Sequence, residues 1–239
     1  MKLGGVISRF RLILRKLWAE TMSSQEYVEI LKKQGVKIGE NVNFRYPCHT
    51  TIDTTRPTLI EIGNNVDIND NFTIMTHDFG TYVFRNLYGD FIPSSGRVVI
   101  GDNIYFGRNV TVLKGVTIGD NCIIGLGSII TKDIPSNSVA CGAPARVMCS
   151  IEEYYEKRKK ICTKEAVAFA RSIKERLGRD PLITDFKEEW ALFLTEQEFL
   201  DNPQLKEIID WRLGQSFIKY RKDHSAMIEG FDSFMELVR

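Results

Sequence analysis

The sequence lacks long hydrophobic runs, a paired set of cysteines and an excess of charge of either sign. No apolar run approaches the roughly 18 residues that a membrane-spanning helix needs. A formal net charge of +1 creates no global field that would attract nucleic acid. The five cysteines are odd in number and form no CxxC pair, so a disulfide framework is not expected. These absences favour a reduced, cytoplasmic protein that binds no nucleic acid.

The overall composition is that of an ordinary globular protein. Hydrophobic residues make up 43% of the 239 residues and charged residues 26%. This length suffices for one or two domains with a substantial core. Arg9, Arg11 and Arg15 interrupt the first apolar positions, which argues against a secretory signal.

Residues 1–20 have the apolar spacing of an amphipathic helix. The positions that recur at steps of three and four are Leu3, Val6, Ile7, Phe10, Ile13, Leu14, Leu17 and Trp18. Two interpretations stay open, namely peripheral contact with an anionic membrane surface and docking on the protein or a partner subunit. Ser23 and Glu26 then have capping-box spacing, and Gly35 predicts the end of a second helix. We therefore predict an N-terminal helical segment over residues 1–35.

A six-residue period follows and is the strongest signal in the chain. Its key apolar positions, several of them followed by glycine, are Ile62, Ile68, Ile74, Ile100, Phe106, Val112, Ile118, Ile124 and Ile130. A period of six fits a short strand followed by a tight turn, with the apolar side chains pointing inward. Three such units would close a coil of about eighteen residues, and successive coils would stack as parallel strands about 4.8 Å apart. We expect the glycine and asparagine residues after each corner to provide positive φ angles.

The repeat is interrupted once and is followed by helical patterns. Residues 80–97 have no six-residue phase, and we predict a loop that is extruded from the stack of coils. A long loop inside a compact repeat array is usually functional. Residues 151–177 predict a helix that ends at Gly178, and further helical segments follow. The predicted domains are thus a repeat domain over residues 36–150 and a C-terminal α-helical domain over residues 151–239.

Two segments near the end of the repeat resemble the closing signature of the hexapeptide-repeat acetyltransferases. They are IGDNCIIGLGSIITKDIP at residues 118–135 and GAPAR at residues 142–146. The family includes enzymes that acetylate maltose, galactosides, capsular sugars and xenobiotics, and the resemblance covers roughly residues 36–150. It implies a mainly β fold with a left-handed parallel β-helix, a homotrimer with active sites between subunits, acetyl-CoA as the acetyl donor and no required metal. The handedness comes from the resemblance and not from the period.

The resemblance also assigns roles to individual residues. The family carries its catalytic histidine just before the extruded loop, which gives the role of general base to His77. Histidine suits this role because an unperturbed imidazole titrates at about pH 6.5. No nucleophilic residue is required, so we expect direct acetyl transfer without an acyl-enzyme. The following residue, Asp78, would orient the imidazole or bind the acceptor.

The binding residues fall in two groups. By resemblance, acetyl-CoA would contact Gly107, Arg108, Gly125, Leu126, Thr131, Lys132 and Arg146. The acceptor would contact Asp78, Tyr82, Arg85 and Tyr88, because aromatic faces stack well on sugar rings. The loop residues of the second group would equally well cover the subunit interface, and both interpretations stay open.

The predicted function is acetyl transfer from acetyl-CoA to a hydroxyl of a cell-surface or capsular saccharide. An antibiotic O-acetyltransferase on the same fold is the main alternative. A zinc hydratase would need three convergent histidines, but one of the three in this chain, His224, lies outside the repeat. A non-catalytic trimeric scaffold, whose helical tail binds a partner protein, is a further alternative.

Overall fold

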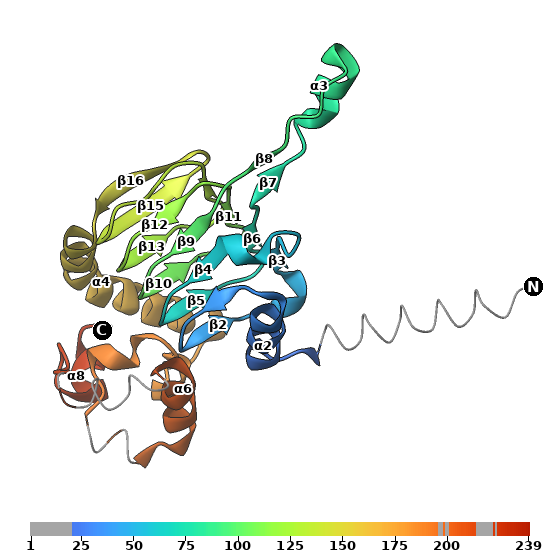
Figure 1. The fold of residues 1–239 in the computed structure, drawn as a ribbon. Helices are drawn as coiled ribbons and strands as arrows, with labels where there is room; N and C mark the ends of the chain where they lie inside the picture. Colours follow the sequence, from blue (N-terminus) through green and yellow to red (C-terminus); the bar gives the residue numbers. More distant parts are fainter. Residues whose placement is uncertain (1–20, 196–197, 199–200, 214–221, 223) are drawn as a thin grey trace, which may run out of the picture. The chain divides into compact units, whose positions relative to one another are not determined.

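The computed structural model describes residues 21–195, 198, 201–213, 222 and 224–239 (Figure 1). The helix predicted over the first twenty residues lies outside the described residues. The chain divides into two compact units, Met1–Tyr154 and Tyr155–Arg239, which are treated separately below.

The first unit consists of short strands in three sheets, whose pairing is parallel except at one edge. The first sheet holds β1 (Lys37–Ile38), β4 (Ile60–Ile62), β9 (Val98–Ile100) and β12 (Thr117–Ile118). The second holds β2 (Val42–Phe44), β5 (Val66–Ile68), β10 (Ile104–Phe106), β13 (Cys122–Ile124), β15 (Ser138–Gly142) and the antiparallel edge strand β16 (Ala145–Ser150). The third holds β3 (Thr51–Ile52), β6 (Thr73–Ile74), β11 (Thr111–Val112) and β14 (Ile129–Ile130). Each coil adds one strand to each sheet in turn, so the chain forms a three-sided solenoid, as the stacked strands in Figure 1 show.

The coils differ in length. The hydrogen bond between Asp102 and Asp120 joins equivalent positions of two coils that are 18 residues apart. The first pair of coils is 24 residues apart, because the short turns η1 (Pro47–His49) and η2 (Pro57–Leu59) are inserted. The second pair is 38 residues apart, because the segment between β6 and β9 leaves the stack. The last pair is 16 residues apart, from Asn121 to Asn137. The predicted coil of about eighteen residues is therefore confirmed for the coils that Asp102 and Asp120 join, and the other coils are longer or shorter.

A single column of apolar side chains fills the solenoid. All nine key positions of the six-residue period are buried, with at most 2% of the residue exposed, and they belong to one core cluster. Cys122 occupies an inward position in the same column and is 1% exposed. The inward direction predicted for the key positions is confirmed.

Asparagine and glycine serve different purposes at the corners. The residues with positive φ include Asn41, Asn65, Asn71, Asn103, Asn109, Asn121 and Asn137. The amide of Asn103 donates to Asn121 over 2.9 Å, and that of Asn121 donates to Asn137 over 2.9 Å, so these side chains form a ladder. The glycines after the key positions do not have positive φ, so that part of the prediction is wrong. At Gly101, a Cβ atom would lie 2.3 Å from Asp120 Oδ1, which means that the next coil leaves no space for a side chain.

Helix α2 (Ser24–Gln34) covers the first coil. Ser23 caps it in a capping box with Glu26, and Gly35 ends it with φ of 107°, as predicted. Val28 and Leu31 are buried in the core cluster of the solenoid. The helix therefore shields one end of the apolar column from water.

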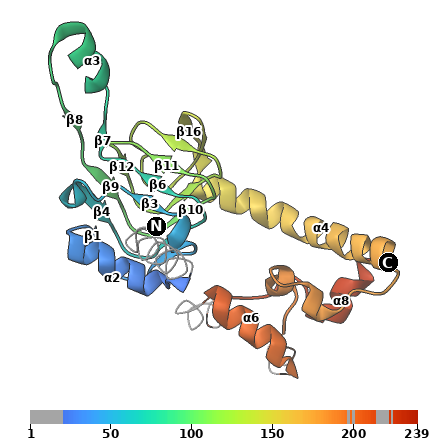
Figure 2. The same ribbon diagram turned by 90° about the vertical axis from the view of Figure 1, so that its right-hand side faces the viewer.

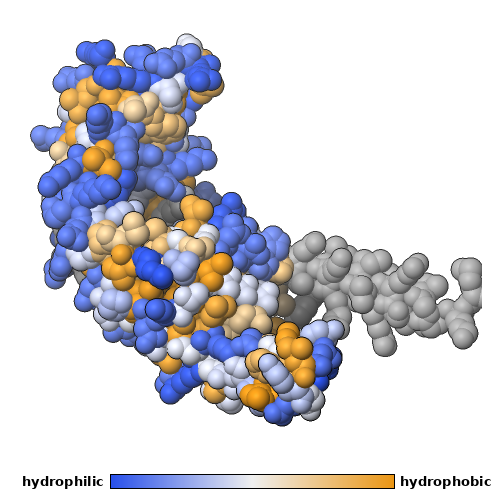
Figure 3. Space-filling view, turned by 90° about the horizontal axis from the view of Figure 1, so that it is seen from above, coloured by the Kyte–Doolittle hydropathy of each residue, from blue (hydrophilic) through white to orange (hydrophobic). Residues whose placement is uncertain are grey.

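The interruption forms an arm, which we define as residues 77–95. It contains the antiparallel strands β7 (His77–Asp78) and β8 (Ser94–Ser95) and helix α3 (Thr81–Tyr88). Both ribbon views show it leaving the stack of coils, as predicted (Figures 1 and 2). Its exposed apolar residues are Phe79, Tyr82, Val83, Phe84, Leu87, Tyr88, Phe91 and Ile92. Hydrophobic atoms at its tip are visible from above (Figure 3).

The second unit is helical in its described part. Helix α4 (Ile151–Leu177) runs into it from the first unit, and Gly178 follows with φ of 63°. The unit continues with η3 (Ile183–Asp185), η4 (Glu189–Leu192), α6 (Pro203–Leu213) and α8 (Gly230–Glu236). Phe186, Phe193 and Phe234 are fully buried in one of its cores. Within the described residues, no helix has both the length and the apolar character to span a membrane.

The replacement Gly101→Ala should lower the free energy of unfolding by about 1–3 kcal/mol, because the added Cβ overpacks against the next coil. Urea denaturation at constant protein concentration measures this loss. The matched control is Gly115→Asn, at a position with φ of 75° where an added Cβ would have no neighbouring atom within 4 Å. Asparagine tolerates left-handed backbone, so the control should lose less than about 1 kcal/mol. Equal losses in the two variants would contradict the close approach of the coils.

Candidate active site

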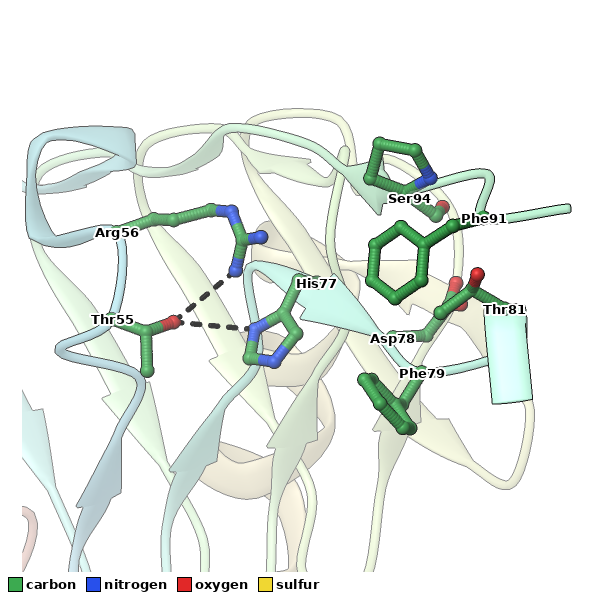
Figure 4. A pocket seen from close by; sticks show the side chains of 9 residues that line it. Thr55, Arg56, His77, Asp78, Phe79, Thr81, Phe91 and Ser94 are labelled. Carbon is green, nitrogen blue, oxygen red and sulfur yellow. Dashed lines mark hydrogen bonds between the residues drawn. The ribbon is translucent and has the colours of Figure 1, made fainter. Parts of the chain in front are cut away.

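His77 lies where the chain leaves the solenoid for the arm. Strand β6 ends at Ile74, and His77 begins β7 three residues later. Its side chain is 24% exposed and lines a pocket at the base of the arm (Figure 4). The imidazole is therefore held by the rigid stack on one side and is accessible on the other.

A buried carboxylate contacts the imidazole. Ile52 pairs with Ile74 in the third sheet, so Asp53 is stacked one coil away from the segment that leads to His77. The Asp53 side chain is 3% exposed, and its Oδ2 lies 2.5 Å from His77 Nδ1. The main-chain N–H of Asp53 donates to the Ile74 carbonyl over 3.0 Å, which holds the carboxylate at this corner.

Two threonines complete the surroundings of this carboxylate. Oδ2 of Asp53 accepts hydrogen bonds from the N–H of Thr76 (3.0 Å) and from its hydroxyl (2.5 Å). Oδ1 accepts hydrogen bonds from the N–H of Thr55 (3.1 Å) and from its hydroxyl (2.6 Å). Burial by itself raises the pKa of Asp53, but the hydrogen bonds from Thr55, Thr76 and His77 outweigh it, so the pKa lies well below its ordinary value. Asp53 is thus an anion at neutral pH.

The anionic state of Asp53 determines which imidazole nitrogen is available. An ionised carboxylate only accepts hydrogen bonds, so the contact with Nδ1 requires a hydrogen on that nitrogen. In the neutral imidazole the lone pair then resides on Nε2. The geometry therefore prepares His77 to accept a proton at Nε2 and to hold the resulting positive charge beside Asp53.

Asp78 does not occupy the orienting position. Its carboxylate pairs with the Lys114 ammonium, and it accepts a hydrogen bond from the N–H of Gly80 over 3.0 Å. Mainly because of Lys114, the pKa of Asp78 is lowered to about 2. The imidazole contacts Asp53 instead, which the sequence prediction missed. The sequence does show an acidic residue directly after Ile52. The irregular length of that coil, however, hides its alignment with the coil that leads to His77.

The pocket beside His77 is small. Its lining residues are Thr55, Arg56, His77, Asp78, Phe79, Thr81, Phe91, Pro93 and Ser94. Its volume is about 180 Å³. Pockets that enclose an organic ligand usually measure about 300–1,000 Å³, so this pocket within one chain can hold only part of such a ligand.

The residues that the resemblance assigns to acetyl-CoA lie at other corners, and none of them lines this pocket. Gly107 and Arg108 follow β10, and the equivalent Gly125 and Leu126 follow β13 one coil further on. The Leu126 side chain is 76% exposed. Thr131, Lys132 and Arg146 are exposed, the first two after β14 and the third in β16.

The residues predicted to bind the acceptor are separated by the structure. Asp78 lines the pocket, whereas Tyr82, Arg85 and Tyr88 lie on α3 and do not. The Arg85 guanidinium lies 4.6 Å from the centre of the Tyr82 ring, and Tyr88 is 75% exposed. A ligand in this pocket of a single chain would therefore contact Asp78 but not the three residues on α3.

The described residues offer no convergent set of potential metal ligands. Within the part of the chain that the structure describes, no three His, Cys, Asp or Glu side chains group together as a metal site would require.

Comparisons with known proteins agree with the repeat. Residues 97–132 match the family model described as bacterial transferase hexapeptide (six repeats). The chain is 38% identical over 144 residues to Protein CapG of Staphylococcus aureus, a match that covers 60% of this chain and 83% of that protein. It is 33% identical over 165 residues to galactoside O-acetyltransferase of Lactococcus lactis subsp. lactis, covering 59% of this chain and 77% of that protein. Among solved structures, a maltose O-acetyltransferase from Clostridium difficile 630 is 28% identical with a TM-score of 0.40, covering 62% of this chain and 89% of that one.

The replacement Asp53→Asn should destabilise the protein in a pH-dependent manner. The pKa of Asp53 is lower in the folded than in the unfolded protein. Its contribution to the free energy of unfolding is therefore complete above the unfolded pKa of about 3.9 and is lost as the pH falls through the folded pKa. At neutral pH the free energy of unfolding of the variant should be about 1–3 kcal/mol lower than that of wild type, and this difference should shrink below about pH 4. Chemical denaturation across this pH range measures both.

The control for this experiment is Asp67→Asn. Asp67 pairs with Arg45 at the surface and is 31% exposed, so its loss should cost about 1 kcal/mol or less. A difference between wild type and Asp53→Asn that stays constant down to strongly acidic pH would contradict the anionic, hydrogen-bonded state of Asp53.

Proposed function

The chain belongs to the hexapeptide-repeat acetyltransferase family, and on this premise we propose that it moves an acetyl group from acetyl-CoA to a hydroxyl of a cell-surface or capsular saccharide. The observation that carries the proposal is the contact between the buried Asp53 and the half-buried His77, which lines a pocket at the base of the arm. The sugar acceptor is supported by relatives that are named for sugar acetylation.

In this proposal His77 is the general base. Its Nε2 takes the proton of the acceptor hydroxyl while the oxygen attacks the thioester carbonyl, and the proton passes to the departing sulfur of CoA. Asp53 keeps the hydrogen on Nδ1 and stabilises the imidazolium that forms in between. The acetyl group passes directly to the acceptor, so no residue of the chain needs to carry it. A positioned base of this kind typically contributes about 10²–10⁴ in rate.

Acetyl-CoA supplies the activated acetyl group as a substrate, and the corners after β10 and β13 fit its extended arm. The main-chain N–H groups of Arg108 and Leu126 donate to no acceptor among the described residues. These two N–H groups lie on adjacent coils, as the hydrogen bond from Gly127 N–H to the Arg108 carbonyl indicates. We assign the pantetheine arm to this row, formed with Gly107 and Gly125.

The nucleotide end of acetyl-CoA carries phosphates and would bind cationic side chains. We assign it to Thr131, Lys132 and Arg146, which are exposed to solvent. A phosphate contact suits the guanidinium of Arg146, which donates to the Ala145 carbonyl over 2.8 Å and keeps further N–H groups available.

We further propose that the protein is a homotrimer whose active sites lie between subunits. The proposal is supported by two features of the single chain, namely the small volume of the His77 pocket and the absence from its walls of all residues assigned to acetyl-CoA. The exposed apolar residues of the arm, Tyr82 and Tyr88 among them, would be covered by a neighbouring subunit or by the acceptor.

Two structural parts of the proposal remain. The left-handed sense of the solenoid is inferred from the family, whereas the C-terminal helical domain over residues 151–239 is supported by helices α4, α6 and α8. A cytoplasmic location is supported by the five cysteines, all of which are free thiols.

The replacement His77→Ala should lower the rate of acetyl transfer by about 10²–10⁴, because the acceptor hydroxyl loses its base. Release of CoA from acetyl-CoA, measured against a panel of sugars, nucleotide-sugars and antibiotics, identifies the acceptor and gives the rate. The control is His224→Ala, since His224 belongs to the second unit and bonds to the Ala191 carbonyl. Unchanged activity of His77→Ala would place the base elsewhere, and acetylation of antibiotics alone would contradict the saccharide acceptor.

A further inference from the structure

Arg56 places a cationic group in the wall of the His77 pocket. It immediately precedes η2 and is half-buried (Figure 4). Its Nη1 donates to the Thr55 hydroxyl oxygen over 3.3 Å. Arg56 forms no ion pair with any carboxylate of the described residues, whereas Arg45 pairs with Asp67 and Arg179 pairs with Asp185.

The other charged groups at the pocket already have partners. Asp78 pairs with Lys114, and the anionic Asp53, which does not line the pocket, accepts hydrogen bonds from Thr55, Thr76 and His77. Among the described residues of the pocket wall, the guanidinium of Arg56 is therefore the charged group that has no counter-ion in contact with it. A ligand group of negative charge would be a suitable partner.

The position of the guanidinium follows from a short chain of hydrogen bonds. The Thr55 hydroxyl donates its single hydrogen to Asp53, over 2.6 Å, so it can only accept from Arg56. The same oxygen lies 3.5 Å from His77 Nδ1. Arg56 is thus held beside the proposed base, and most of its five N–H donors remain available to a ligand.

A second feature of the pocket also indicates a polar ligand. Thr81 lines the pocket, and its hydroxyl is buried and has no hydrogen-bond partner in the described part of the chain. The residue is only 4% exposed. Buried hydroxyls nearly always have a partner in native structures, so a hydroxyl or carboxylate of a bound molecule is a suitable partner here.

We propose that the acceptor is an acidic sugar, and that Arg56 binds its carboxylate or phosphate while an adjacent hydroxyl is presented to His77. The planar guanidinium matches either anion with two parallel hydrogen bonds. This inference rests on the proposed function, since it names the substrate class of the same site. Arg56 then determines specificity and takes no part in proton transfer.

Matched sugars that differ only in the acidic group test the proposal. The probes are the methyl glycosides of glucuronate and glucose, of galacturonate and galactose, and of N-acetylmannosaminuronate and N-acetylmannosamine, with glucose 6-phosphate as the phosphate arm. Calorimetric titration of the full chain measures binding. Wild type should bind at least one acidic member about tenfold or more tightly than its neutral partner, and Arg56→Gln should reduce this preference to about twofold or less.

Two further variants sharpen the test. Arg56→Lys keeps the charge but loses the planar fork, so it should retain an intermediate preference. Arg97→Gln is the matched control, because Arg97 pairs with Glu61 and does not line the pocket. It should bind all probes as wild type does.

The outcomes separate this inference from the proposed function. Equal binding of acidic and neutral partners, no binding of any probe, or a preference that survives in Arg56→Gln would overturn it. A rise in the KM for acetyl-CoA alone in Arg56→Gln would also overturn it, by assigning the guanidinium to the donor. Binding that depends on Arg56 without acetyl transfer would leave the acidic-sugar site intact and remove the proposed activity. Acetyl transfer to neutral sugars, with no preference for acidic ones, would support the proposed activity and overturn the acidic-sugar site.

Discussion

The structure depends on the in-register stacking of successive coils, which brings residues distant in sequence into direct contact. Parallel strands are about 4.8 Å apart, so a side chain at one corner meets the side chain at the same corner of the next coil. The asparagine ladder from Asn103 through Asn121 to Asn137 depends on this register, and so does the absence of a side chain at Gly101. The same stacking brings Asp53 to His77 although 24 residues separate them.

The site uses this rigidity to hold a charge in a buried position. An unpaired buried carboxylate would be protonated, but Thr55 and Thr76 each provide an N–H and a hydroxyl to Asp53. The hydrogen bonds outweigh burial, so the charge persists next to the imidazole. Acetyl transfer in a hexapeptide-repeat enzyme of this kind would therefore need little reorganisation around the proposed base, because the groups that stabilise an imidazolium are already in place.

Much of the architecture could be predicted from the sequence, because the same residue types recur at the same spacing in successive repeats. The key apolar positions, the capping box of Ser23 and Glu26 and the helix over residues 151–177 all follow local rules that tertiary packing does not override. The glycines after the key positions were expected to have positive φ, but they are needed because the next coil comes too close for a side chain. A glycine in the sequence does not show which of these two reasons applies. Asp53 was missed because two inserted turns shift the first coil out of phase, so its contact with His77 appears only after the coils are stacked.

The central claim is that Asp53 promotes the proton transfer of the reaction through the imidazole of His77. A double-mutant cycle on the rate of acetyl transfer tests this most directly, using Asp53→Asn, His77→Ala and the two changes combined. If the account is right, each single change lowers the rate strongly, and adding Asp53→Asn to His77→Ala lowers it no further. Losses that multiply in the double variant would contradict the account, because Asp53 would then contribute independently of the imidazole.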